Sequence, residues 1–275
     1  PLPFTPFKDF TGRSINEINL YSTEMSSALC SIDRVTTSAN MNNRLSEAIV
    51  DAYKSTNGAP ISFELILKYY QLKMKDANND DSISSVLKNL IKAHIFESED
   101  KVSLIDDSYI IKMDGYPKDG PIAKAIVYFL MSKLNNIYEL LDKQAVNDEV
   151  VQIRHFSIID EAHYMLDFDN RPLRNLIAVG RNKGLSIILA TQNMSSFKSK
   201  GFDFYANAQY PLIMKQQTID DKVIKDLFGV SGQELQEIRT AIAGLQKGEL
   251  IIKDQMAFAL GMGNKYKKIN VTHLI

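Results

Sequence analysis

Two short apolar runs, each ending in polar residues, set the strongest limit on how this chain can fold. The first, residues 155–159, ends in the carboxylate pair Asp160–Glu161, and the second, residues 185–190, ends in Thr191–Gln192. Runs of this length are too short for helices and are typical of buried parallel strands. Open α/β sheets bind ligands at the carboxyl ends of such strands. The sequence therefore predicts a ligand site where the two polar ends meet.

Nucleotide hydrolysis is the chemistry that suits these residues. Asp160 would hold Mg²⁺ through water, and Glu161 would act as the general base on the attacking water. Gln192, with Thr191 beside it, would sense a γ-phosphate or orient the water. The alternative for Asp160 and Glu161 is the start of a helix, where acids favour the dipole. That alternative explains one acid, but it explains two acids after a buried run less well.

These segments carry a resemblance to a known superfamily. Residues 158–163 resemble a Walker B strand, and residues 180–184 leading into residues 190–192 resemble the HerA/FtsK superfamily of ring-forming, DNA-pumping ATPases. The opening residues 1–7 are similar to the segment after the second sheet strand in that superfamily. The resemblance implies a RecA-like α/β ATPase core that binds ATP and Mg²⁺, acts on DNA and assembles as a ring, expected to be a hexamer.

The same resemblance gives Arg181 a role as an arginine finger that reaches the nucleotide of the neighbouring subunit. Arg154, Arg171 and Arg174 are possible substitutes for it. The alternative is that Arg181 is an ordinary solvated surface arginine. A zinc site at His155 and His163 is disfavoured, because a spacing of eight residues across a strand end is not a ligand pattern.

One departure from the superfamily concerns the phosphate-binding loop. That loop has the pattern G-x-x-x-x-G-K-[ST], whose amides and lysine neutralise the phosphates. No Gly-Lys dipeptide occurs in the 275 residues, and the nearest imitation, residues 115–120, continues with Pro121 and is interpreted as a plain loop. In the superfamily this loop precedes the Pro-Leu-Pro segment. We therefore expect the chain, which begins at Pro1, to be the downstream part of a longer motor protein.

The overall fold class is expected to be α/β: a RecA-like ATPase core without its phosphate-loop portion, carrying an all-helical insertion. Residues 1–11 would lead into the core in extended form, residues 12–98 would form the insertion, and residues 99–275 would complete the core. The predicted helices cover residues 14–31, 42–54, 121–141, 171–179, 218–228 and 231–242, with two further helices that begin at Ser62 and Asp81. The predicted strands cover residues 102–105, 109–113 and 210–215, a hairpin of 248–253 with 256–261, and an edge strand at 267–274.

Composition narrows the class of protein. With 45% hydrophobic and 24% charged residues the chain is an ordinary globular protein, and its net charge of −1 gives no global basic surface for nucleic acid. Any DNA contact would therefore be local, and Lys198 and Lys200 in a serine-rich loop are the candidates, although such loops are more often simply solvated. The single cysteine, Cys30, suits a reducing cytoplasm, and no membrane span or signal peptide is visible.

Three readings of function remain open at this point. The insertion and the Pro-Leu-Pro opening resemble members used in bacterial defence, of the DptH type found in phosphorothioation-dependent restriction, with restriction-system proteins as partners. Asp160–His163 also spells the Asp-Glu-Ala-His box of superfamily-two helicases, but the next strand ends in Ala-Thr-Gln rather than their Ser-Ala-Thr-like motif. The third possibility is a non-catalytic assembly or DNA-binding scaffold with vestigial ATPase features, which the missing phosphate-binding loop favours.

Overall fold

The structure is a computed structural model that describes residues 1–32, 37–74, 80–147, 150–166, 168–192, 194–199, 202–208, 210–254, 256, 259 and 265–271. The chain divides into two compact units. Unit 1 consists of Pro1–Ile158 and Phe168–Ile188, and unit 2 consists of Ile159–Asp167 and Leu189–Ile275. Each unit is described by itself.

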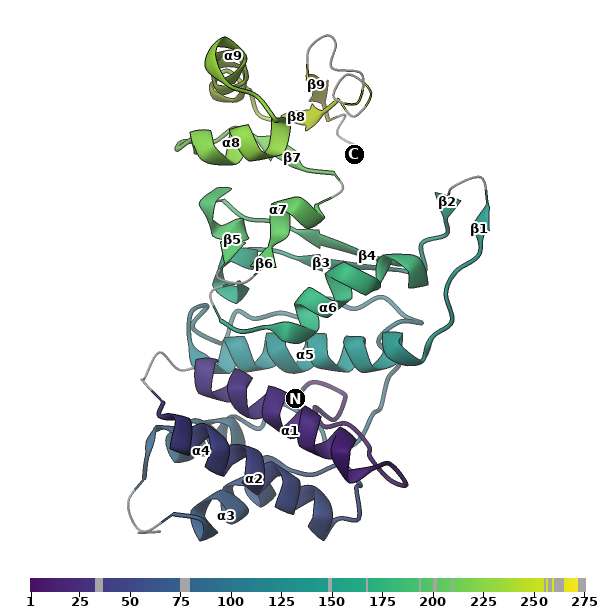
Figure 1. The fold of residues 1–275 in the computed structure, drawn as a ribbon, viewed down its shortest axis with the longest axis vertical. Helices are drawn as coiled ribbons and strands as arrows, with labels where there is room; N and C mark the ends of the chain where they lie inside the picture. The colour runs from purple at the N-terminus through teal and green to yellow at the C-terminus, as the bar shows by residue number, and fades with distance from the viewer. Residues whose placement is uncertain are drawn as a thin grey trace. The chain divides into compact units, whose positions relative to one another are not determined.

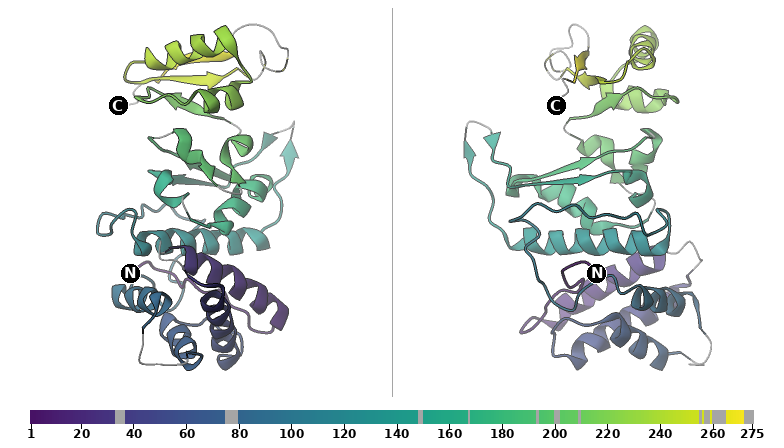
Figure 2. Two further views of the ribbon diagram at one scale, coloured as in Figure 1. Left: turned by 60° about the vertical axis from the view of Figure 1, so that its left-hand side comes forward. Right: turned by 180° about the vertical axis from the view of Figure 1, so that it is seen from behind.

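Unit 1 combines a helical group with a pair of strands (Figure 1). In it, α5 lies between the helices α1 to α4 on one side and α6 with the strands β3 and β4 on the other, as the views in Figure 2 also show. The helices are α1 (Ile15–Ile32), α2 (Ala39–Ser55), α3 (Phe63–Leu72), α4 (Ser82–Ala93), α5 (Pro121–Leu140) and α6 (Arg171–Val179). The strands are β1 (Val146–Asn147), β2 (Val150–Val151), β3 (His155–Ile159) and β4 (Leu185–Leu189).

Helices α3, α4 and α5 begin at the residues expected from the sequence, whereas α2 begins at Ala39, capped by Ser38, rather than at residue 42. The Ser62 hydroxyl accepts a hydrogen bond from the Leu65 amide at 3.2 Å, and Asp81 accepts one from the Ser84 amide at 2.9 Å. Each bond satisfies an amide that has no partner within the first turn of the helix. Pro121 stands in the first turn of α5, where its missing N–H costs nothing. These helix predictions are confirmed.

The opening segment belongs to the core of unit 1. Leu2 forms a parallel bridge with Phe96, and Phe4 is fully buried. Phe7 packs edge to face against Phe63 and Phe129, with ring centroids 4.9 and 5.9 Å apart. Because aromatic side chains bury large areas, this cluster fixes the opening segment, which bends at residues 3–4 and 6–7, against α3 and α5.

Strands β3 and β4 pair directly with each other. At their start, the Arg154 amide donates to Gly184 O at 2.7 Å, and at their end the Ala190 amide donates to Ile159 O at 2.9 Å. Since the two starts lie together and the two ends lie together, the strands run parallel, as expected. The polar residues after both strands are therefore brought to one edge.

The expected burial of β3 and β4 on both faces is wrong for the described residues. Phe156 and Ile158 alternate along β3 and are 56% and 69% exposed, and Ile188 on β4 is 42% exposed. Ile159 and Leu185 are buried. A strand exposes alternate side chains to opposite faces, so one face of this pair is covered and the other is open.

The strands expected at residues 102–105 and 109–113 are absent, and turns and irregular chain occupy residues 100–120. Leu104 is buried, but Tyr109 is 42% and Ile110 89% exposed. Strand propensity is mostly the packing of side chains against neighbouring strands, and no described strand pairs with these two runs. The loop at residues 115–120 ends at Gly120, the residue that precedes α5.

Unit 2 contains a three-stranded antiparallel sheet in the order β7–β8–β9. Two helices, α8 and α9, share a hydrophobic core with its strands. The core includes Ile213 of β7, Ile251 of β8 and Phe228 of α8. The elements of this unit are the 3₁₀ helices η1 (Ala162–Met165) and η3 (Met194–Phe197), β5 (Lys198–Ser199), β6 (Phe202–Asp203), α7 (Phe204–Asn207), β7 (Leu212–Met214), α8 (Asp221–Phe228), α9 (Gly232–Ala243), β8 (Glu249–Lys253) and β9 (Tyr266–Asn270).

The expected hairpin of residues 248–253 with 256–261 is wrong. Strand β8 pairs on one side with β7 and on the other with β9. Most of residues 256–261 lies outside the described part of the chain. The predicted edge strand near the C-terminus is confirmed as β9. Its Lys267 and Lys268 form ion pairs with Asp254 at 2.8 Å and Glu249 at 2.7 Å.

The turn before β4 requires glycine at residue 184, which has φ +83°. A Cβ there would lie 2.8 Å from Gln152 O and 3.0 Å from the Arg154 amide nitrogen. We expect Gly184→Ala to lower the free energy of unfolding by about 2 kcal/mol or more, since the left-handed backbone alone costs about 1–2 kcal/mol for an L-residue. Equilibrium denaturant unfolding measures this change.

Substitutions at two other glycines distinguish the cost of the left-handed backbone from the cost of steric crowding. Gly12 has φ +74° and nothing within 4 Å of an added Cβ, so Gly12→Ala should cost about 1 kcal/mol. Gly115 has neither a positive φ nor a neighbour, so Gly115→Ala should stay within about 0.5 kcal/mol of the wild type. Equal costs in all three variants would contradict the role given to the turn at Gly184.

Candidate active site

The candidate site lies where the chain leaves β3 and β4, within unit 2. Backbone bonds continue past the strand ends, because the Ala162 amide donates to Ala190 O at 2.8 Å. Ala162 is fully buried in the turn that follows β3. The segment after β3 is therefore tied to the segment after β4, and the polar side chains of both segments are brought together.

Glu161 and Gln192 are in direct contact. Gln192 Nε2 donates a hydrogen bond to Glu161 Oε1 over 2.5 Å. A bond between an amide and a carboxylate is charge-assisted and therefore stronger than a neutral one. The sequence placed both residues at one edge on separate strands, and the structure brings them into contact.

The backbone of Glu161 is left-handed, with φ 51° and ψ 41°. This conformation is uncommon for a residue with a side chain and costs about 1–2 kcal/mol. Such strain persists only where the surrounding structure holds it, and it is concentrated at functional sites. Here the turn into η1 produces it and aims the Glu161 side chain at Gln192.

Asp160 is exposed, and its Oδ1 accepts a hydrogen bond from the Glu161 amide at 2.9 Å. Within the described residues, no three His, Cys, Asp or Glu side chains gather closely enough to hold a metal alone. Mg²⁺ commonly keeps several waters and binds through one or two carboxylates and the substrate phosphates. An exposed carboxylate beside a glutamate fits that coordination, so Asp160 remains the candidate ligand.

His163 also belongs to this group of residues, and the sequence analysis did not place it there. Its Nδ1 lies 3.4 Å from Glu161 Oε2 and 3.3 Å from Thr191 Oγ1. Gln192 therefore contacts Glu161 directly, and Thr191 contacts His163, which lies beside Glu161. A cue in the sequence was available, because His163 stands two residues after Glu161 in the same tight turn.

His155 is in a different environment, at the start of β3 in unit 1. Its ring stacks on Tyr138 with centroids 6.4 Å apart, and its Nδ1 is buried without a hydrogen-bond partner. Burial lowers the pKa of the His155 imidazole, because desolvation disfavours its charged form. His155 therefore behaves as a packed, neutral ring.

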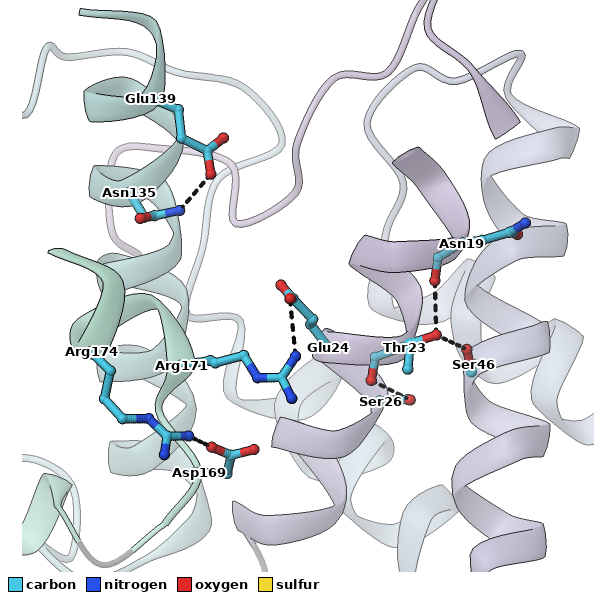
Figure 3. A network of polar contacts seen from close by, with 10 residues as sticks. All are labelled: Asn19, Thr23, Glu24, Ser26, Ser46, Asn135, Glu139, Asp169, Arg171 and Arg174. Carbon is cyan, nitrogen blue, oxygen red and sulfur yellow. Dashed lines mark hydrogen bonds and ion pairs between the residues drawn. The ribbon is translucent and has the colours of Figure 1, made fainter. Parts of the chain in front are cut away.

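The four candidate arginines differ in whether they are already engaged. Arg171 pairs with Glu24 of α1 at 3.1 Å, and Arg174 pairs with Asp169 (Figure 3). Arg154 is engaged by Gln144: when the oxygen and nitrogen of the Gln144 amide exchange places, the oxygen accepts a hydrogen bond from Arg154 Nε at 2.9 Å. Arg181 is exposed, and although its carbonyl oxygen accepts from the Gly184 amide at 3.0 Å, its side chain makes no hydrogen bond or ion pair with the described residues.

Lys183, which follows Arg181 in the same loop, has a structural role. Its Nζ donates to the carbonyl oxygens of Tyr138 at 2.6 Å and Glu139 at 3.1 Å, in the last turn of α5. A cation at this position satisfies carbonyls that have no partner within the helix and complements the helix dipole. The loop of residues 180–184 is thus anchored to α5 while Arg181 remains unpaired.

The structure tests little of the DNA-binding candidates. The backbone of Lys198 lies in β5, where it pairs with Asp203 of β6. Lys200 lies outside the described residues.

Comparison with solved structures identifies the fold. VirB4 of Thermoanaerobacter pseudethanolicus matches with a TM-score of 0.68 over 98% of this chain and 73% of that protein, at 17% identity. The plasmid coupling protein TrwB, in complex with the non-hydrolysable GTP analogue GDPNP, matches with a TM-score of 0.57 over 96% of this chain and 71% of TrwB, at 12% identity.

The chain has the P-loop ATPase fold of VirB4 and TrwB. This confirms the expected α/β, RecA-like class of fold. Neither the models of protein families nor the curated proteins gave a match. Among the described helices, none combines the length and the apolar character needed to cross a bilayer.

The strain at Glu161 can be measured by comparing two substitutions that both remove the side chain. We expect Glu161→Gly to be more stable than Glu161→Ala by about 1 kcal/mol, because only glycine adopts the left-handed backbone without penalty. Denaturant unfolding of the two variants gives the difference directly.

Glu237 provides the matched control, because it is exposed and lies in the interior of α9. At that position alanine should be more stable than glycine by about 1 kcal/mol, the usual order in a helix. The same order at both positions would show that the backbone of Glu161 is not left-handed in solution.

Proposed function

We propose that this chain is the downstream part of an ATP-driven DNA-translocating motor, helicase-like in mechanism, in which Asp160, Glu161, Thr191 and Gln192 form part of the nucleotide site. The observation that carries the proposal is the 2.5 Å hydrogen bond between Gln192 Nε2 and Glu161 Oε1 at the ends of two parallel strands. The fold supports it, and the similar protein TrwB was solved with a GTP analogue.

The proposed roles follow from the chemistry of each group. Glu161 takes a proton from the attacking water, and Gln192 orients that water while it holds Glu161. Asp160 holds Mg²⁺ through water, and the metal neutralises charge on the phosphates when it is bound. Thr191 contributes a hydroxyl at the same edge. Positioning and electrostatics supply most of the catalysis in phosphoryl transfer, so the order of this group matters more than its reactivity.

Arg181 is the proposed arginine finger. It is exposed and unpaired among the described residues, whereas Arg171 and Arg174 are engaged with acids. An arginine that acts on a neighbouring subunit must be free within its own chain. This supports assembly as a ring, proposed to be a hexamer, in which each Arg181 stabilises charge on the next nucleotide.

DNA is the proposed substrate of the motor, and bacterial restriction or defence is its proposed setting, with restriction-system proteins as partners. The net charge of −1 gives no global excess of basic residues, so the DNA contacts would come from loops repeated around the ring, with Lys198 and Lys200 as candidates. The cytoplasm is the proposed location.

The second candidate is a non-catalytic assembly or DNA-binding scaffold. The absence of a Gly-Lys dipeptide from the sequence favours it, because nothing in these residues supplies the lysine and amides that neutralise the phosphates. Reading the DNA on the 5′ side of the Pro1 codon separates the two. A G-x-x-x-x-G-K-[ST] pattern after an apolar run would support the motor, and an open reading frame without it would support the scaffold.

The chain by itself should hydrolyse ATP very slowly, because it lacks the phosphate-binding loop. In a protein that contains both this chain and such a loop, we expect DNA-stimulated hydrolysis. Glu161→Gln should lower kcat by roughly a thousandfold, since the amide cannot take a proton. Arg181→Ala should lower kcat by about a thousandfold or more. Steady-state phosphate release with and without DNA measures both effects.

Mixing the two inactive variants tests whether the site is shared between subunits. A ring that combines Glu161→Gln and Arg181→Ala subunits contains some interfaces with an intact Glu161 on one side and an intact Arg181 on the other. Partial recovery of ATP hydrolysis is therefore expected on mixing. Wild-type rates in both single variants would contradict the catalytic roles given to Glu161 and Arg181, and no hydrolysis by the wild type, with or without DNA, would favour the scaffold.

A further inference from the structure

We propose that His163 is a positioning residue that orients the Glu161 carboxylate and links it to Thr191. This inference rests on the proposed function, because it deepens the account of the same nucleotide site. It assigns a role to a side chain that the sequence had suggested only as an improbable metal ligand.

The two oxygens of the Glu161 carboxylate have different neighbours. Gln192 Nε2 donates to Oε1 at 2.5 Å, and His163 Nδ1 lies 3.4 Å from Oε2. A single hydrogen bond leaves a carboxylate free to rotate about that contact. A contact on each oxygen, the hydrogen bond on Oε1 and the close imidazole beside Oε2, restricts both its place and the plane of the group. His163 therefore supplies the second of two points that define where the proposed base is aimed.

The hydrogen-bond chemistry specifies which form of the imidazole can do this. Nδ1 of His163 is hydrogen-bonded to Thr191 Oγ1 at 3.3 Å, and Glu161 Oε2 lies 3.4 Å from the same nitrogen, within reach of an electrostatic contact. A neutral imidazole carries one N–H. With the proton on Nδ1, the N–H is donated to Thr191 Oγ1 and its positive charge lies beside the carboxylate, whereas a bare Nδ1 would turn a lone pair toward Glu161 Oε2. The arrangement favours the Nδ1–H form.

The backbone around His163 is held in place. His163 belongs to η1, whose first residue, Ala162, is buried and donates its amide to Ala190 O at 2.8 Å. The His163 ring also packs against Tyr164, with centroids 4.0 Å apart. A movement of the segment after β4 would therefore move Gln192, Thr191 and the support of His163 together. Both contacts to Glu161 respond to the same segment.

The consequence for catalysis is one of geometry. A displacement of about 1 Å in a catalytic group can cost on the order of a hundredfold in rate. Without His163, Glu161 keeps Gln192 as a partner but loses the contact that fixes its second oxygen. We expect a loss in kcat with little change in KM, because His163 lies beside the base and not among the residues proposed to bind the nucleotide.

The first experiment measures the protonation of the His163 ring nitrogens by NMR and does not depend on catalysis. The chain contains four histidines, so ¹⁵N-histidine labelling gives a small set of signals, and His163→Asn identifies the signal of His163 by its loss. We expect ring nitrogen shifts of the Nδ1–H form, and a clear change in them in Glu161→Ala. Glu237→Ala, in α9, is the control and should leave them unchanged. An Nε2–H pattern that Glu161→Ala does not alter would overturn the proposal.

The second experiment uses the ATP-hydrolysing protein defined for the proposed function. In His163→Asn the amide nitrogen can occupy the place of Nδ1, and kcat should stay within about tenfold of wild type. In His163→Gln the amide reaches the place of the far ring nitrogen instead, and kcat should fall by about a hundredfold at unchanged KM. His94→Asn, at an exposed αL helix end, is the matched control and should have no effect.

The outcomes separate this inference from the function on which it rests. Equal kcat values in His163→Asn, His163→Gln and the wild type would overturn the positioning role while the motor stands. No hydrolysis by the wild type would overturn the motor, and the nitrogen shifts would then decide whether His163 orients Glu161.

Discussion

The parallel pairing of β3 with β4 is the constraint on which the site depends. Parallel neighbours finish on the same side, so residues about thirty positions apart in sequence leave the sheet together. The pairing extends beyond the strands, because Ala190 accepts a hydrogen bond from the Ala162 amide after donating one to Ile159 O. Glu161, His163, Thr191 and Gln192 are then confined to one small region, where their side chains contact one another.

Local signals in the sequence predicted much of the fold. Ser62, Asp81 and Pro121 begin helices for reasons that act within one turn, and the structure confirms them. The missing strands at residues 102–113 and the wrong hairpin partner of β8 have a different origin. Strand formation depends on which segment arrives as a neighbour, and apolar residues such as Ile110 do not encode that choice.

Part of the candidate site could likewise be predicted from the sequence, and part could not. The carboxylates and the amide could be predicted because each ends an apolar run, and the parallel arrangement then places them at one edge. The closeness of His163 to Glu161 in the sequence was a cue, but it did not predict their contact, because the contact depends on a left-handed backbone at Glu161. Glutamate carries no preference for that conformation, so only the assembled turn reveals it. The availability of Arg181 likewise became apparent only once the partners of Arg171 and Arg174 were known.

The anchoring of Lys183 in the last turn of α5 has a consequence for assembly. Two subunits that associate lose the freedom of every segment that becomes ordered between them, and this loss weakens the complex. The loop that carries Arg181 is already held by the bonds from Lys183 to Tyr138 O and Glu139 O. In the proposed ring, only the arginine side chain itself would remain to be ordered when a neighbour binds. The loop would thus be preorganised for the contact, and the entropy lost on forming the interface would be correspondingly small.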